Sequence, residues 1–147
     1  MFEKTDKKKN KIDRETAVDS FNLFCENWEI DCDESGMNQD DKIDFESQKS
    51  KIVNAIMKGR MVYDDSGIIK YTISEKSGEK LQGKEISIRR PKGAAYMEMD
   101  RFKDRQGVHK TYAVLSAMTG QDEAFFSKLD GIDLKPFMAV VTLFLAG

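Results

Sequence analysis

Two stretches in the N-terminal third of the chain place apolar residues at intervals of three and four positions. The first begins at Asp13, a residue type that often caps a helix start, and its apolar positions are Ala17, Val18, Phe21, Phe24, Cys25 and Trp28. This spacing puts them on one face of a helix. The second stretch predicts a helix from about Asp44 to Lys58 that ends at Gly59. The aromatic stripe of the first helix must be buried, either against the rest of this chain or against another chain.

The middle of the chain follows the two-residue period of β-strands. Residues 61–63 and 68–73 lie on either side of a turn-forming Asp-Ser-Gly segment and predict a β-hairpin. Residues 85–89 alternate apolar and polar side chains, which predicts a third strand with one buried face. Pro91 ends that strand, because proline lacks the N–H that a sheet ladder needs and presets φ for a helix start. We therefore expect a small antiparallel β-sheet within about residues 61–90.

Helical spacing returns after the sheet and continues to the C-terminus. We expect helices at about residues 94–105, 108–118 and 121–129, with glycines at the breaks between them. The last helix is expected to have Asp133 as its cap and Pro136 in its first turn, where a missing N–H costs little. The predicted fold class is therefore α+β: a small antiparallel sheet, a packed helical C-terminal half and a helical N-terminal extension.

The chain divides on this pattern into two parts. Residues 1–59 form a polar N-terminus and a two-helix extension with an acidic loop, and residues 60–147 form the α+β domain. The acidic stretch covers residues 26–46, which hold nine carboxylates and one lysine. Of all 147 residues, 39% are hydrophobic and 34% are charged, which is enough apolar material for a core beneath a charge-rich surface.

Charge and hydropathy exclude several classes of partner. The formal net charge of −2 gives no overall attraction to nucleic acid or to an anionic membrane. A mildly basic patch at residues 76–105 is read as a solvated face, or as a surface that meets the acidic stretch of a neighbouring copy. The N-terminus lacks a signal-peptide pattern, and the most apolar stretch, residues 137–146, is about half a membrane span. We expect a soluble, cytoplasmic protein that binds neither nucleic acid nor membrane.

One segment resembles a calcium-binding loop. Residues 31–42 place oxygen-bearing side chains at positions one, three and five and a glycine at position six, as in an EF-hand. Position twelve, however, is Lys42, where the loop requires a bidentate glutamate. Cys25 and Cys32 likewise lack the additional ligands of a structural zinc site. We predict no metal site, and a regulatory protein-binding module with a degenerate calcium loop is kept as the alternative function.

Residues for acid–base or nucleophilic catalysis are sparse. The single histidine, His109, has no partner in a recognisable motif, and no serine or cysteine is accompanied by an evident base. The glycines do not form a phosphate-binding loop. We therefore predict that the protein is not an enzyme, has no catalytic residues and needs no cofactor.

Three ordered elements in the second half carry a resemblance to a known family. A strand ends in arginine and proline, a Leu-x-x-x-Thr-Gly element follows within the helices, and the last helical segment begins near an aspartate. Over roughly residues 68–147 this order resembles the phage tail assembly chaperone family, of the Mu-like or prophage type. The residues that carry the motif are read as structural: Arg89, Arg90, Pro91, Thr119, Gly120 and Asp133.

The resemblance implies a function and partners. Such a protein would be a non-enzymatic chaperone that binds the tape measure protein, tail tube subunits or both during tail morphogenesis in the bacterial cytoplasm, and it would be absent from the mature virion. Amphipathic helices suit this work, because a helical client needs apolar grooves. We also expect a homo-oligomer, because the apolar stripes offer more surface than a monomer leaves exposed. The residues expected to make protein contacts are Phe21, Phe24, Trp28, Phe137, Val141, Phe144 and Leu145.

Overall fold

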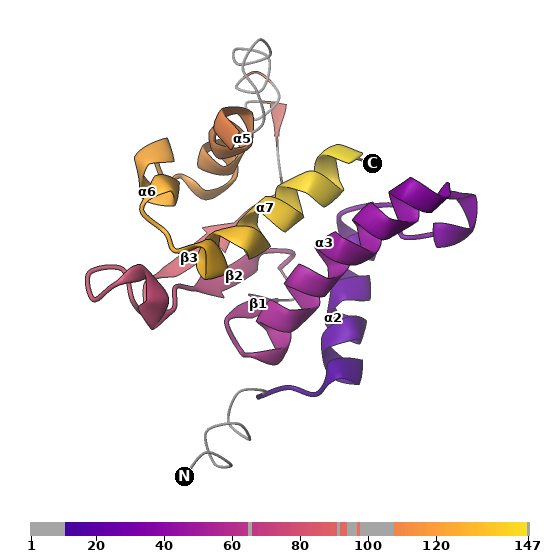
Figure 1. Ribbon diagram of the computed structural model, residues 1–147, viewed down its shortest axis with the longest axis horizontal. Coiled ribbons are helices and arrows are strands. Elements are labelled where there is room, and N and C mark those ends of the chain that lie inside the picture. The colour runs from indigo at the N-terminus through magenta and orange to yellow at the C-terminus, as the bar shows by residue number, and fades with distance from the viewer. Residues whose placement is uncertain (1–10, 65, 91, 94–96, 98–107, 147) are drawn as a thin grey trace.

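The computed structural model describes residues 11–64, 66–90, 92–93, 97 and 108–146, and it has the α+β architecture that the sequence predicts (Figure 1). A three-stranded sheet is covered by helices from both ends of the chain. The elements are α2 (Arg14–Asn27), η1 (Glu34–Gly36), α3 (Gln39–Met57), β1 (Met61–Tyr63), β2 (Ile69–Thr72), η2 (Glu75–Ser77), β3 (Glu85–Ile88), α5 (Val108–Thr119), α6 (Glu123–Ser127) and α7 (Gly131–Ala146).

The two N-terminal helices confirm the predicted pair, with one change of boundary. The Asp13 side chain caps α2 by accepting the backbone N–H of Thr16 at 2.7 Å, as expected. Helix α3 begins at Gln39, earlier than predicted, because the side chain of Asn38 caps it by accepting the N–H of Asp41 at 2.8 Å. Acidic residues in the first turn of α3 also suit the positive end of the helix dipole. Part of the predicted acidic loop is therefore helical.

The sheet confirms the predicted hairpin and third strand. Its order is β1-β2-β3, and both pairings are antiparallel. Met61 pairs with Tyr71 across the first pair of strands, and Ile69 pairs with Ile88 across the second. All four of these side chains are buried. The alternation of residues 85–89 predicted one buried face, and Ile86 and Ile88 do lie in the core.

The C-terminal helices agree in position and differ in detail. Helices α5 and α6 match two of the predicted segments, whereas the helix expected at residues 94–105 and the role of Pro91 fall outside the described residues. Helix α7 begins at Gly131, so Asp130 rather than Asp133 occupies the cap, and the Asp130 side chain accepts the N–H of Ile132 at 2.9 Å.

The earlier start of α7 also moves its proline. Pro136 lies in the second turn of the helix and not in the first. At that position its missing N–H removes the hydrogen bond that an ordinary residue would donate to the carbonyl of Ile132. The expectation that the proline costs little was therefore wrong, because it depended on placing the start of the helix at Asp133.

One hydrophobic core joins the two predicted parts of the chain. Helix α7 packs against α3 on one side and α5 on the other (Figure 1), and α2 and α3 both contact β1. Aromatic rings continue through this core. The ring centroids of Trp28, the C-cap of α2, and Phe144 of α7 are 6.3 Å apart, and those of Phe137 of α7 and Tyr71 of β2 are 4.9 Å apart. The boundary predicted at residue 60 therefore does not separate two cores. Among the described helices, none is both long and apolar enough to cross a membrane.

Candidate binding site

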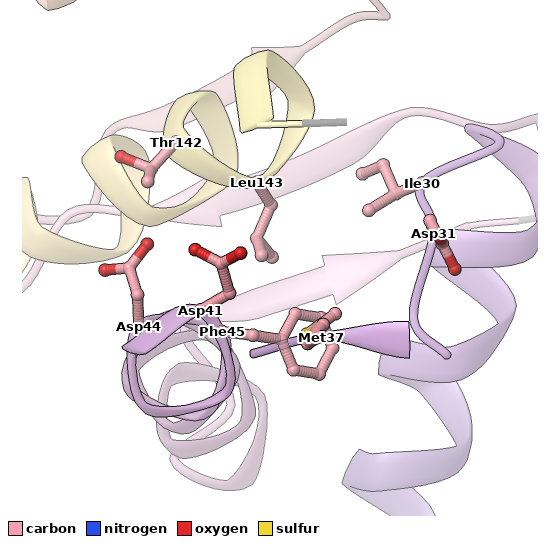
Figure 2. Close-up of a pocket in the computed structure, with 8 residues that line it drawn as sticks. All are labelled: Ile30, Asp31, Met37, Asp41, Asp44, Phe45, Thr142 and Leu143. Atoms are coloured by element: carbon pink, nitrogen blue, oxygen red, sulfur yellow. The ribbon is translucent and has the colours of Figure 1, made fainter. Parts of the chain in front are cut away.

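A pocket lies between the N-terminal part of α3 and the C-terminal half of α7 (Figure 2). Phe45 and Leu143 are almost fully buried beneath it and give it an apolar floor, and exposed carboxylates stand at its rim. The pocket has a volume of about 270 Å³ and is lined by Ile30, Asp31, Met37, Asp41, Asp44, Phe45, Thr142 and Leu143.

The cap of α3 determines where the rim carboxylates lie. Because the helix starts at Gln39, Asp41 falls in its first turn and Asp44 lies three positions further, on the same face. Figure 2 shows both side chains pointing from α3 toward α7, with Ile30 and Asp31 across the gap. Lysine and arginine combine an apolar stem with a cationic head, so this arrangement suits a basic side chain of another protein.

A second pocket lies at the other end of the same two helices and has the opposite charge. Lys51 and Lys58 come from the C-terminal part of α3 and its cap, and Lys135 comes from the N-terminal part of α7. Ile132, which is 42% exposed, stands beside these cations. The pocket has a volume of about 120 Å³ and is lined by Lys51, Asn54, Ala55, Lys58, Arg60, Ile132, Lys135 and Pro136.

The calcium-like segment is organised by its own backbone. The Asp31 carboxylate accepts the N–H of Asp33 at 2.9 Å, and the Asp33 carboxylate accepts the N–H of Ser35 at 3.0 Å. The Ser35 hydroxyl also donates to the Asp33 carboxylate, and the bonds from the hydroxyl and the N–H of Ser35 hold the pKa of Asp33 below its usual value. Lys42 lies inside α3. Across the described part of the chain, no three His, Cys, Asp or Glu side chains are grouped so that they could hold a metal ion.

Most residues predicted to contact a partner instead form the core of this chain. They were predicted to contact a partner because they are large and apolar, but in the structure they pack against other residues of the same chain. Phe144 is half-buried and Leu145 is 39% exposed, so these two are the ones that a partner can reach. The contact role is corrected for the five that are at most 2% exposed: Phe21, Phe24, Trp28, Phe137 and Val141.

The motif residues at the ends of β3 and α5 have structural contacts. Arg89 and Arg90 are exposed; the N–H of Arg89 donates to the carbonyl of Met118, and Arg90 forms an ion pair with Glu29 at 3.7 Å. The Thr119 hydroxyl donates to the carbonyl of Leu115 at 2.7 Å. Gly120 follows with φ +78°, a conformation that favours glycine and ends α5.

Asp133 is the most highly connected of the motif residues. It is fully buried, and its carboxylate accepts hydrogen bonds from the Tyr71 hydroxyl at 2.8 Å, the Ser74 N–H at 3.0 Å, the Ser74 hydroxyl at 2.9 Å and the Ser77 hydroxyl at 2.5 Å. Burial raises the pKa of Asp133, but the hydrogen bonds from these three residues outweigh it and hold the pKa below its usual value. Asp133 therefore fastens α7 to the segment between β2 and β3.

Sequence reasoning missed both pockets and the partners of Asp133. Tyr71 and Asp133 are separated by 62 positions, and no local pattern links them. In the sequence, a tyrosine near the end of a predicted strand is followed closely by two serines, and this group of hydroxyls could have indicated a buried acceptor. In comparisons with known proteins, no family model, no curated protein and no solved structure matches this chain.

Proposed function

We propose that this protein is a non-enzymatic phage or prophage tail assembly chaperone that binds the tape measure protein, tail tube subunits or both. The proposal draws on the resemblance over residues 68–147 and on one structural observation, the acid-rimmed apolar pocket between α3 and α7. In this proposal, the pocket is where the protein holds its client.

The chemistry of the pocket defines the client segment that it fits. An amphipathic helix with a lysine or arginine beside apolar residues would place the cation among Asp31, Asp41 and Asp44 and its apolar side chains over Phe45 and Leu143. The exposed Leu145 and half-buried Phe144 extend this apolar surface along α7. Exposed ion pairs contribute about 0.2–1 kcal/mol each, so the contact would be reversible, as a chaperone needs.

Co-expression with the candidate clients tests this function. The tape measure protein and the tail tube protein encoded nearest to this gene would each be produced with and without the chaperone. We expect the chaperone to increase the soluble fraction of at least one of them and to co-purify with it. A genome in which no tail tube gene and no gene for a very long helical protein lies nearby would contradict the proposal.

Charge variants connect the function to the pocket. The Asp41→Lys/Asp44→Lys variant should lose the client, because the rim becomes cationic. Asp19→Lys/Glu26→Lys makes the same change in net charge on exposed positions of α2 and should retain it. If both variants bind the client equally well, the pocket is not the client site. If both lose the client, the loss reflects the change in overall charge and not the pocket.

A further inference from the structure

Helices α3 and α7 lie side by side and run in opposite directions (Figure 1). The acidic pocket joins the start of α3 to the end of α7, and the basic pocket joins the end of α3 to the start of α7. One elongated surface therefore carries a negative end and a positive end. We name it the α3/α7 face and define it by the residues that line the two pockets.

No ion pair among the described residues neutralises the charges at the two ends. Among the described residues, the ion pairs are Lys70–Asp64 and Arg90–Glu29, and neither involves the α3/α7 face. The dipole of α3 accounts for Asp41 in its first turn and for Lys58 at its C-cap. It does not account for Asp31, which lies on the loop after α2, or for Lys135, which lies on α7. The separation of charge thus extends beyond what α3 needs for its own stability.

We propose that the α3/α7 face binds the same face of a second copy of this chain in a two-fold symmetric dimer. A two-fold axis through the middle of the face would place the acidic end of each copy on the basic end of the other. Asp44 and Lys51 are about 10 Å apart along α3, and Asp41 and Lys58 are about 25 Å apart. The midpoint of each pair along α3 lies within one helical turn of Gln48–Lys49. A single two-fold axis at that point would therefore bring both acidic residues opposite the basic residues of the other copy.

Shape supports the same pairing. Ile132 is a large apolar side chain that is 42% exposed among the cations of the basic end. The acidic end offers a pocket with an apolar floor of the kind that such a side chain can enter. In the dimer, Ile132 of each copy would enter the acidic pocket of the other, with Lys135 and Lys58 reaching the carboxylates at the rim. The dimer would cover the pocket that the proposed function assigns to the client, yet it does not depend on any client.

Complementary charge reversal tests the dimer. Asp41→Lys/Asp44→Lys makes both ends of the face basic, and Lys51→Glu/Lys58→Glu makes both ends acidic. Sedimentation equilibrium should show the wild-type chain as a dimer whose dissociation constant rises with salt. Each variant alone should dimerise at least about ten-fold more weakly, because every changed position occurs twice in the interface. An equimolar mixture of the two should form a heterodimer, which also shows that both variants are folded.

Ile132→Asp and Ile43→Asp provide a matched pair of apolar variants. Ile43 is 60% exposed on α3 and lines neither pocket. We expect Ile132→Asp to weaken dimerisation at least about ten-fold and Ile43→Asp to leave it unchanged. An equal effect of both would indicate unspecific association and overturn the proposal.

Three further outcomes would overturn the proposal: a wild-type chain that stays monomeric at high concentration, variants that dimerise like the wild type, or a mixture that does not associate.

Client binding separates this proposal from the function proposed above. Lys51→Glu/Lys58→Glu removes the dimer and leaves the acidic pocket intact, so it should still hold a client. A failed dimer with retained client binding would refute the dimer alone. A wild-type chain that dimerises, together with a monomeric Lys51→Glu/Lys58→Glu variant that binds no client, would refute the function alone.

Discussion

Replacement of Asp133 is expected to destabilise the fold more than any change at an exposed carboxylate. Its side chain accepts four hydrogen bonds, and two of the donors, the Tyr71 hydroxyl and the Ser74 N–H, are buried. In Asp133→Ala both donors lose their acceptor, at about 1–3 kcal/mol each, while the serine hydroxyls can turn elsewhere. The expected loss in the free energy of unfolding is about 4 kcal/mol. For a chain of this size that lowers Tm by about 13 °C.

Asp133→Asn removes the negative charge of this side chain and keeps its shape. The amide oxygen can still accept from Tyr71 and Ser74, but bonds to a neutral acceptor are weaker than bonds to a carboxylate. We expect a loss of about 2 kcal/mol in the free energy of unfolding, measured by urea denaturation. Asp130→Asn is the matched control, because Asp130 is exposed and its side chain accepts only the N–H of Ile132. That variant should stay within about 0.5 kcal/mol of the wild type.

The effect of Asp133→Asn should depend on pH in one direction. The pKa of Asp133 is lower in the folded protein than in the unfolded chain, where it is about 3.9. A depressed folded pKa contributes stability that is fully present above the unfolded pKa and is lost as the pH falls through the folded value. The difference between wild type and variant should be constant from pH 7 to about pH 5 and shrink below about pH 4. A difference under about 1 kcal/mol at pH 7, or one that does not shrink in acid, would refute the reasoning.

Three other outcomes follow from burial and chemistry. Burial raises the pKa of the thiols of Cys25 and Cys32, but only Cys32 is partly exposed, so mass spectrometry after iodoacetamide treatment should show slow labelling at Cys32 and none at Cys25 until the protein unfolds. Phe21→Ala should cost about 3–5 kcal/mol in urea denaturation because its ring is fully buried, and Leu145→Ala should cost under about 1 kcal/mol. Calcium at millimolar concentration should leave Tm unchanged because Lys42 replaces the bidentate ligand; a rise in Tm would favour the regulatory alternative.

Features with a local signal were predicted well. Asp13, the strand pattern of the hairpin and the alternation of residues 85–88 each determine the conformation of their own neighbourhood, and the structure confirms the helix cap, the pairing of β1 with β2 and the third strand. The start of α3 was placed too late because Asn38 sits in a run of polar residues, where a cap and a loop residue look alike. The start of α7 was also misplaced, because Asp130 and Asp133 are both acceptable caps by residue type and only the backbone distinguishes them.

Features that depend on distant contacts could not be read from the chain. Periodicity identified the apolar stripe of α2 correctly but could not say whether this chain or another covers it. The two pockets exist because α3 and α7 are antiparallel neighbours, and helix direction has no signature in a local pattern. The sequence showed that the start of α3 is rich in acidic residues. Their position opposite Thr142 and Leu143 depends on how the two helices pack, which the sequence did not show.

The central place of α7 explains why the N-terminal extension belongs to the fold. Its buried residues Phe137, Ala139, Val140, Val141 and Leu143 spread over about 200° of the helix circumference, which is more than one face. A helix that is apolar around most of its circumference must be covered on several sides. The hydrogen bonds of Asp133 hold its start, α5 covers one side, and α3 together with Trp28, the C-cap of α2, covers another. Because residues 14–57 supply that last cover, α7 and the sheet would expose core residues without them, and the two predicted parts share one core.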